Sequence, residues 1–129
     1  MGMYTGLKGT IKIKEEVIEN FSEFINGDLD IGWEGILPEG HGWLNYRRNS
    51  FIPFGSLCYM PHSWEEVKMN LDKETREFTF ACSLKNYEGE IRYFIENVLP
   101  IIGLSWELEE LYEEDEEPVL HIYREEDFF

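Results

Sequence analysis

The sequence predicts an α+β fold, a ferredoxin-like sandwich with two helices on one face of an antiparallel sheet of about five strands. Hydrophobic periods of strands and helices follow the order strand, helix, strand, strand, helix, strand, strand, which is two βαβ halves plus one added C-terminal strand that forms an acidic hairpin. A chain of 129 residues with 43% hydrophobic content is enough for one ordinary domain with a core. We therefore expect one domain over residues 1–129, with an aromatic- and glycine-rich loop insertion near 28–56.

The first half of the chain predicts a strand followed by a helix. Residues 7–14 alternate small or apolar with polar side chains, which is the period of a half-buried strand. A helix over 15–26 follows, because its apolar residues recur on one stripe and Asn26-Gly27 is a stop signal. The residues of that stripe are Val17, Ile18, Phe21, Phe24 and Ile25.

The insertion carries large aromatic side chains among five glycines and two prolines between Gly32 and Gly55. We expect an ordered loop with a strand near 56–60, since loops of this length inside a compact domain are often functional. Its aromatic residues are expected to cover the core in part and to be available in part for a partner, because aromatic anchors dominate interface energetics. The alternative is a loop that only covers the open face of the sheet. The residues concerned are Trp33, Trp43, Tyr46 and Phe54.

The second half repeats the pattern of the first. Residues 78–82 predict a strand with Phe78, Phe80 and Cys82 on one face, and Asn86 is expected to cap a helix over 87–99 that Pro100 ends. Strands over 104–108 and 119–124 then form the hairpin, whose edge is expected to be acidic. The predicted core consists of Ile11, Ile13, Val17, Phe21, Phe24, Phe80, Ile91, Phe94, Ile95, Val98 and Trp106.

The segment "FTFACSLKNYEGEIRYFIENVLPIIGLSWELEELYEE" combines a strand, a polar turn, a helix ending near a proline, and a strand closing on Tyr112, Glu113 and Glu114. Together with the opening strand and helix, it resembles the YubB-type ferredoxin-like family of small plasmid and phage proteins. The chain departs from that family where residues 82–85, Cys-Ser-Leu-Lys, replace a Trp-Ser-Pro-Pro turn. The resemblance implies a ferredoxin-like fold and a mobile-element origin, and it implies no catalytic residues.

The negative charge is concentrated at the C-terminal end of the sequence. Of the net charge of −16, residues 105–129 contribute −10, from 11 acidic residues and the single base Arg124. Such a surface disfavours direct binding to nucleic acid, which requires Lys and Arg, and favours a basic protein partner. The acidic partner-binding candidates are Glu107, Glu109, Glu110, Glu113, Glu114, Asp115, Glu116 and Glu117.

Two interpretations of this acidic run remain open. It can serve only the solubility of an interaction or housekeeping domain and protect a sheet edge. Alternatively it is a binding face, because Glu107 and Glu109 on one side of a strand lie about 6.6 Å apart, a spacing comparable to that of nucleic-acid phosphates. The second interpretation predicts a phage- or mobile-element-encoded inhibitor that occupies the nucleic-acid site of a basic host target, such as a restriction or CRISPR nuclease.

No residue set predicts a reaction. Cys58, His62 and Cys82 lack the close pairing of zinc ligands, and we expect the cysteines to be small core residues and His41 to be exposed. The contiguous carboxylates share one environment, whereas acid–base catalysis needs carboxylates in unlike environments. We therefore predict no enzyme, metal or cofactor; a small metal-dependent enzyme is the weakest alternative. Two cysteines, no apolar leader and no membrane-length apolar run favour a cytoplasmic monomer or homodimer.

Overall fold

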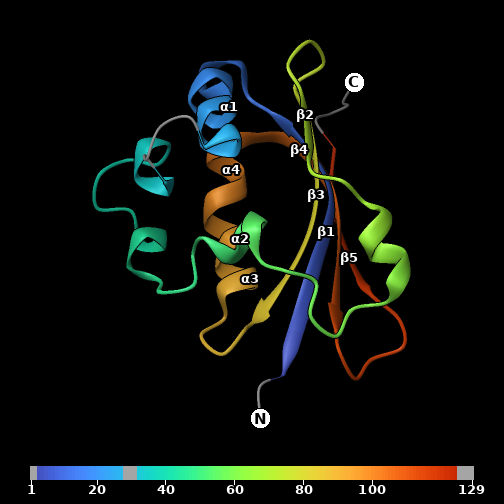
Figure 1. The fold of residues 1–129 in the computed structure, drawn as a ribbon. Coiled ribbons are helices and arrows are strands. Elements are labelled where there is room, and N and C mark those ends of the chain that lie inside the picture. The colour runs from blue at the N-terminus through green and yellow to red at the C-terminus, as the bar shows by residue number, and fades with distance from the viewer. Residues whose placement is uncertain (1–2, 28–31, 125–129) are drawn as a thin grey trace.

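The computed structural model describes residues 3–27 and 32–124, which form one antiparallel sheet with helices against one face (Figure 1). The order of the strands across the sheet is β2-β3-β1-β4-β5. This arrangement confirms the predicted ferredoxin-like α+β sandwich. The strands are β1 (Tyr4–Ile13), β2 (Asn70–Asp72), β3 (Glu77–Lys85), β4 (Gly103–Tyr112) and β5 (Val119–Tyr123).

The central strand β1 sends alternate side chains to opposite faces of the sheet. Leu7, Ile11 and Ile13 are buried against the helices, whereas the even-numbered residues of β1 lie on the other side, which we call the open face. Gly9 lies on the helix side, where β4 approaches very closely. A Cβ atom at Gly9 would lie 2.0 Å from the carbonyl oxygen of Glu107, and its φ of +147° is one that L side chains rarely adopt. Only glycine therefore allows this pairing of β1 with β4.

Helix α1 (Ile18–Asn26) follows a 3₁₀ turn at Glu15–Val17, which confirms the helix predicted over 15–26. Gly27 closes it in the left-handed conformation, with φ 70°, and donates its N–H to the Glu23 carbonyl at 3.0 Å. Phe21 packs edge-on against Phe78 of β3 with ring centroids 4.9 Å apart. The predicted apolar stripe thus attaches the helix to the sheet.

The second helical segment differs at both ends from the predicted span of 87–99. It comprises α3 (Glu90–Tyr93), a π-helical turn (Phe94–Val98) and α4 (Leu99–Ile102). Asn86 accepts a hydrogen bond from the Ile91 N–H at 3.0 Å, although the N-cap position belongs to Gly89. Pro100 does not end the helix, because it lies in the first turn of α4, where a missing N–H interrupts no hydrogen bond.

The strand predicted near 56–60 is absent: these residues form an extended segment and a turn, in which Tyr59 has a φ of 63°. The Ser56 carbonyl accepts the Ser83 N–H of β3 at 3.2 Å, and the Cys58 carbonyl accepts the Ser83 hydroxyl at 3.3 Å. The turn directs the chain away from β3, and the edge position beside β3 is taken by β2. A 3₁₀ turn at His62–Glu66 instead lays buried Trp64 against the open face, 2.7 Å from where a Cβ of Gly6 would lie.

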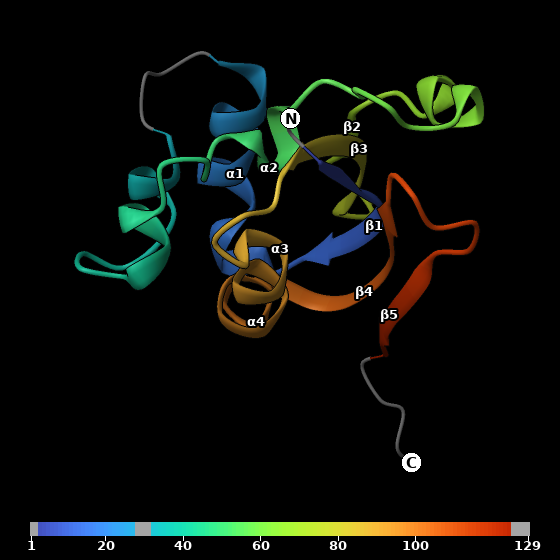
Figure 2. The ribbon, with the colours of Figure 1, turned by 90° about the horizontal axis from the view of Figure 1, so that it is seen from below.

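The insertion packs on the helix side of the sheet, opposite the segment that carries Trp64 (Figure 2). Its described part contains 3₁₀ turns at Trp33–Gly35 and Gly42–Asn45 and the short helix α2 (Phe51–Phe54). Most of the predicted core is buried, and three of its members are only partly buried: Val17, Ile95 and Trp106. No helix in the described ranges has the length and apolar character needed to span a bilayer.

Candidate binding surface

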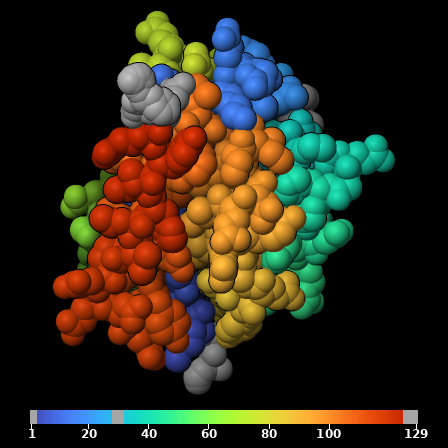
Figure 3. Space-filling model, turned by 180° about the vertical axis from the view of Figure 1, so that it is seen from behind, coloured from blue at the N-terminus to red at the C-terminus, as the bar shows by residue number. Residues whose placement is uncertain are grey.

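The acidic strand β4 lies inside the sheet, between β1 and β5, and the edge strand is β5. The prediction of an acidic edge was therefore wrong, because the hairpin folds its less charged arm to the outside. Figure 3 shows β5 and the loop before it, in red, along one side of the molecular surface. Four of the five residues of β5 are apolar and half or more exposed: Val119, Leu120, Ile122 and Tyr123.

The alternation of β4 places its carboxylates on both faces of the sheet. Glu107 and Glu109 lie on the open face, opposite Thr10 and Lys8 of β1. Glu110 is opposite Leu7 and lies on the helix side. The eight predicted acidic residues thus do not form a single surface.

Three of these carboxylates have partners within the fold. Glu107 faces Arg124 at 3.4 Å, and the Glu110 carboxylate lies 2.9 Å from His121 Nε2. Glu113 holds the end of β1, because its N–H donates to the Tyr4 carbonyl at 2.9 Å and its Oε1 accepts the Tyr4 N–H. These interactions stabilise the hairpin, and they leave its loop as the strongest candidate for a binding surface.

The hairpin loop, residues 113–117, holds five consecutive carboxylates, and none of them forms an ion pair with a described residue. Only Glu113 is half-buried, and the other four are exposed. Partial burial raises the pKa of Tyr112 above its ordinary value, and the negative charges of Glu114, Glu113 and Asp115 raise it further. The loop therefore concentrates negative charge that no ion pair with a described residue neutralises.

The aromatic candidates are divided between the core and the surface. Trp33 and Trp43 are 3% and 0% exposed, and Trp33 Nε1 donates to the Asn49 and Ile52 carbonyls at 3.0 and 2.9 Å. Tyr46 is half-buried beside Trp43, with ring centroids 5.3 Å apart. Phe54 is 44% exposed, although its ring contacts Phe24. The loop covers the helix layer, so the alternative that it covers the open face was wrong.

The candidate metal and thiol residues are not brought together. Cys82 faces the core, where burial raises the pKa of its thiol, whereas Cys58 lies on the opposite side of the sheet beside Ala81. His62 is fully exposed near Glu65. The expectation that His41 is exposed was wrong, because its Nδ1 accepts the Trp43 N–H at 3.0 Å and its ring packs on Tyr93. Within 3–27 and 32–124, no group of three or more His, Cys, Asp or Glu residues could hold a metal ion.

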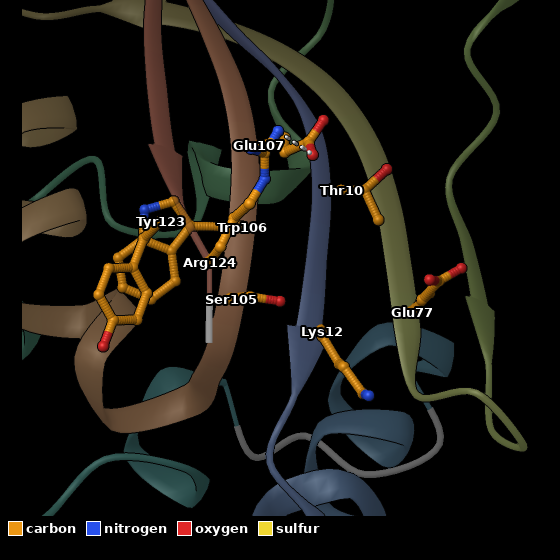
Figure 4. A pocket seen from close by; sticks show the side chains of 8 residues that line it. All are labelled: Thr10, Lys12, Glu77, Ser105, Trp106, Glu107, Tyr123 and Arg124. Carbon is orange, nitrogen blue, oxygen red and sulfur yellow. Dashed lines mark hydrogen bonds and ion pairs between the residues drawn. The ribbon is translucent and has the colours of Figure 1, made fainter. Parts of the chain in front are cut away.

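A shallow hollow of about 560 Å³ on the open face was not predicted (Figure 4). Its charged lining residues are Lys12, Arg124, Glu77 and Glu107, two of each sign, and Arg124 reaches Glu107 across one end. A balanced lining of this kind selects no ligand by charge. No local sequence pattern predicts this hollow, because its lining residues meet only once β1, β3 and β4 are paired side by side.

Tyrosines beside the hairpin loop were also missed by sequence reasoning. Tyr59 is 71% exposed, and its ring packs on Tyr4 with centroids 5.4 Å apart. Tyr4 is in turn bonded to Glu113. These tyrosines come from distant parts of the chain, so no local pattern predicts their meeting.

Comparisons with family models, with curated proteins and with solved structures give no match to this chain. The resemblance to the YubB-type family and the mobile-element origin that it implies therefore stay predictions.

Proposed function

We propose that this chain is a non-enzymatic acidic binding protein that inhibits a basic nucleic-acid-binding host protein by occupying its nucleic-acid site. The sharpest version is a phage- or mobile-element-encoded inhibitor of a restriction or CRISPR nuclease. The observation that carries the proposal is the hairpin loop, whose five carboxylates form no ion pair with a described residue.

A nuclease groove that binds nucleic acid presents Lys and Arg side chains to phosphates about 3.4 Å apart in axial rise along each strand. The five carboxylates lie on a turn and a bend, where the Asp115 N–H donates to the Tyr112 carbonyl at 2.8 Å, so their charge is concentrated on one short segment. Their attraction for such a groove is strong at low salt and is screened beyond about 8 Å at physiological ionic strength. Glu113 sets the position of the loop relative to β1, since its backbone and side chain both bond to Tyr4.

Two predicted candidates contribute less to this surface. Glu107 and Glu110 are already engaged by Arg124 and His121, so a partner cation has to compete for them. Glu109 is half-buried on the open face, opposite Lys8 of β1. We therefore assign most of the electrostatic attraction for the basic partner to residues 113–117.

The experiment is affinity capture from bacterial lysate at low and high salt, with identification of the recovered proteins by mass spectrometry. The test variant reverses Glu113, Glu114, Glu116 and Glu117 to Lys. A matched control reverses Glu16, Glu39, Glu66 and Glu74, which are exposed and have no described ion pair. Both variants change the net charge from −16 to −8, since each replaces four negative charges with four positive ones.

We expect the unmodified protein and the control variant to recover nucleic-acid-binding proteins, with capture falling steeply as salt rises. The hairpin variant is expected to lose this capture, and its circular dichroism spectrum checks that the fold survives, because Glu113→Lys also removes the acceptor of the Tyr4 N–H. If the two variants lose capture equally, total charge matters rather than the hairpin loop. If the hairpin variant keeps full capture, the acidic hairpin serves only solubility.

A further inference from the structure

The two edges of the sheet differ in how they avoid pairing with another chain. The β2 edge is three residues long and presents exposed Asn70 and Asp72, which is how native proteins commonly protect an edge. The β5 edge is longer, and its only polar residue is His121. Leu120 and Ile122 are 61% and 50% exposed. An apolar edge of this kind is typical of a strand that pairs with another strand.

The hydrogen-bond pattern of the sheet shows which groups of β5 are free to pair. The Glu113 N–H bonds to the Tyr4 carbonyl, so the even-numbered residues of β1 exchange hydrogen bonds with odd-numbered residues of β4. The Ile13 N–H bonds to Arg76, which confirms that odd-numbered residues of β1 bond on the β3 side. The even-numbered residues of β4 consequently bond to odd-numbered residues of β5.

The backbone groups of Leu120 and Ile122 therefore point outward, away from β4. The side chains of the same two residues lie on the open face. Pro118 occupies the next outward position before them, where a proline, which has no N–H, is tolerated. Arg124 occupies the next outward position after them.

We propose that β5 pairs with β5 of a second copy of this chain, antiparallel and centred on His121, to form one continuous sheet across a homodimer. A two-fold axis perpendicular to the sheet keeps the helix layers of both copies on the same side. This register places Leu120 opposite Ile122 of the second copy, and Val119 opposite Tyr123. Every exposed apolar residue of β5 then gains an apolar cross-strand neighbour.

The charges at the ends of the strand agree with this register. Arg124, the only Lys or Arg after residue 104, comes opposite Pro118 of the second copy and next to its Glu117. The remaining charge works against association, because each copy carries −16. The dimer therefore strengthens as salt rises, which is opposite to the behaviour proposed for a basic partner.

The size of the contact limits its strength. Five residues a side bury much less than the roughly 1,200 Å² of a standard interface. We therefore expect a concentration-dependent dimer with a dissociation constant in the micromolar range or weaker.

The experiment is sedimentation equilibrium of the purified chain from about 1 to about 200 μM, a range that brackets a micromolar dissociation constant, at low and high salt. The expected result is a monomer–dimer equilibrium that shifts toward dimer at high salt. Ile122→Lys should raise the dissociation constant at least about tenfold, although it lowers the net negative charge. Leu120→Pro should do the same by removing one outward N–H without adding charge. Met69→Lys, at an exposed residue next to β2, is the matched control and should leave the equilibrium unchanged.

The register has its own test in a Cys58→Ser background. Residues facing each other in a pair without hydrogen bonds have Cα atoms about 4.5 Å apart, within the range of a disulfide. His121→Cys should therefore form an intermolecular disulfide under mild oxidation, whereas Tyr123→Cys, which would face Val119, should not. A monomer at every concentration, a dimer that survives Ile122→Lys, or equal cross-linking at both positions would each overturn the proposal. In the first case the β5 edge is left for a strand of another protein.

Discussion

Arg48 Nη1 lies 3.2 Å from Oε2 of Glu90, a carboxylate that is completely buried at the start of α3. The other oxygen, Oε1, accepts the Glu88 N–H at 3.1 Å. The Arg48 side chain is 22% exposed and also lies over the Tyr87 ring, 5.3 Å from its centroid. This ion pair joins the insertion, on which Arg48 lies, to the second helical segment. The insertion therefore has a structural role that its loop-like sequence does not predict.

Arg48→Ala should destabilise the protein by about 3 kcal/mol or more, because it leaves the Glu90 charge buried without its cation. The Arg48→Ala, Glu90→Ala double variant should lose less than the sum of the single variants. Urea unfolding measures these free energies. Arg92→Ala serves as the control, since its pair with Glu96 is exposed and should be worth less than about 0.5 kcal/mol. Equal effects of Arg48→Ala and Arg92→Ala would show that burial adds nothing to the Arg48 pair.

Trp43→Ala and Trp33→Ala should each lower the free energy of unfolding by about 3–5 kcal/mol, as for other buried aromatic residues. Phe54→Ala should cost much less, because the Phe54 side chain is 44% exposed. Thermal or urea unfolding of the three variants measures the difference. Loss of partner binding by Phe54→Ala with unchanged stability would support the predicted partner contact of this loop. An unchanged stability of Trp43→Ala would contradict its place in the core.

Gly9→Ala should destabilise the protein by at least about 2 kcal/mol, because the new methyl group meets the β4 backbone and the residue has a positive φ. Gly40→Ala is the control: its φ of +83° is also unfavourable, but a Cβ atom there has no atom within 4 Å. We expect a cost of about 1 kcal/mol for Gly40→Ala. Melting temperatures of the two variants compare them, and a Gly9→Ala variant as stable as Gly40→Ala would mean that β4 shifts freely.

Cys82 should resist thiol reagents in the folded protein, because burial raises the pKa of its thiol and keeps it protonated. Half-buried Cys58 should react first, and denaturant should expose the second thiol. Ellman's reagent counts both. Two rapidly reacting thiols under native conditions would contradict the burial of Cys82.

The same shift predicts a loss of stability in alkali. The unfolded thiol loses its proton near its ordinary pKa of 9.0, whereas the folded one keeps it. The stabilisation from this group is therefore complete below that pH and is lost progressively as pH rises above it. Between about pH 8 and about pH 10, Cys82→Ala should lose less stability than the unmodified protein, as measured by urea unfolding. Parallel losses would contradict the raised pKa.

Local hydrophobic periods were enough to predict the fold class, since β1, α1 and β3 each bury a stripe that is regular along the chain. They did not predict β2, because three residues are too few to show a period and Asp72 and Asn70 are polar. They misplaced the end of the second helical segment. The π-helical turn at Phe94–Val98 breaks the regular helical spacing of the apolar residues, and the helix continues past Pro100 to Ile102. These errors concern short elements whose conformation depends on tertiary contacts.

For the binding surface, composition predicted an acidic hairpin but not how its carboxylates are divided between the two faces of the sheet. Strand alternation places Glu107 and Glu110 on opposite faces, and each has a partner, Arg124 or His121, that comes from the returning strand. Composition alone treats all eight carboxylates as equal. The order of strands at the sheet edge was needed to see that β5, rather than β4, is outermost.

The proposed inhibition requires the hairpin loop to compete with nucleic acid for a basic site. The direct test measures how well a nuclease recovered by capture binds labelled DNA or RNA while this protein is titrated in. We expect competitive displacement that weakens as salt rises. It should be retained when Glu16, Glu39, Glu66 and Glu74 are reversed to Lys, and lost when Glu113, Glu114, Glu116 and Glu117 are reversed to Lys. Displacement by the hairpin-reversed variant as strong as that by the unmodified protein would contradict the proposed inhibition.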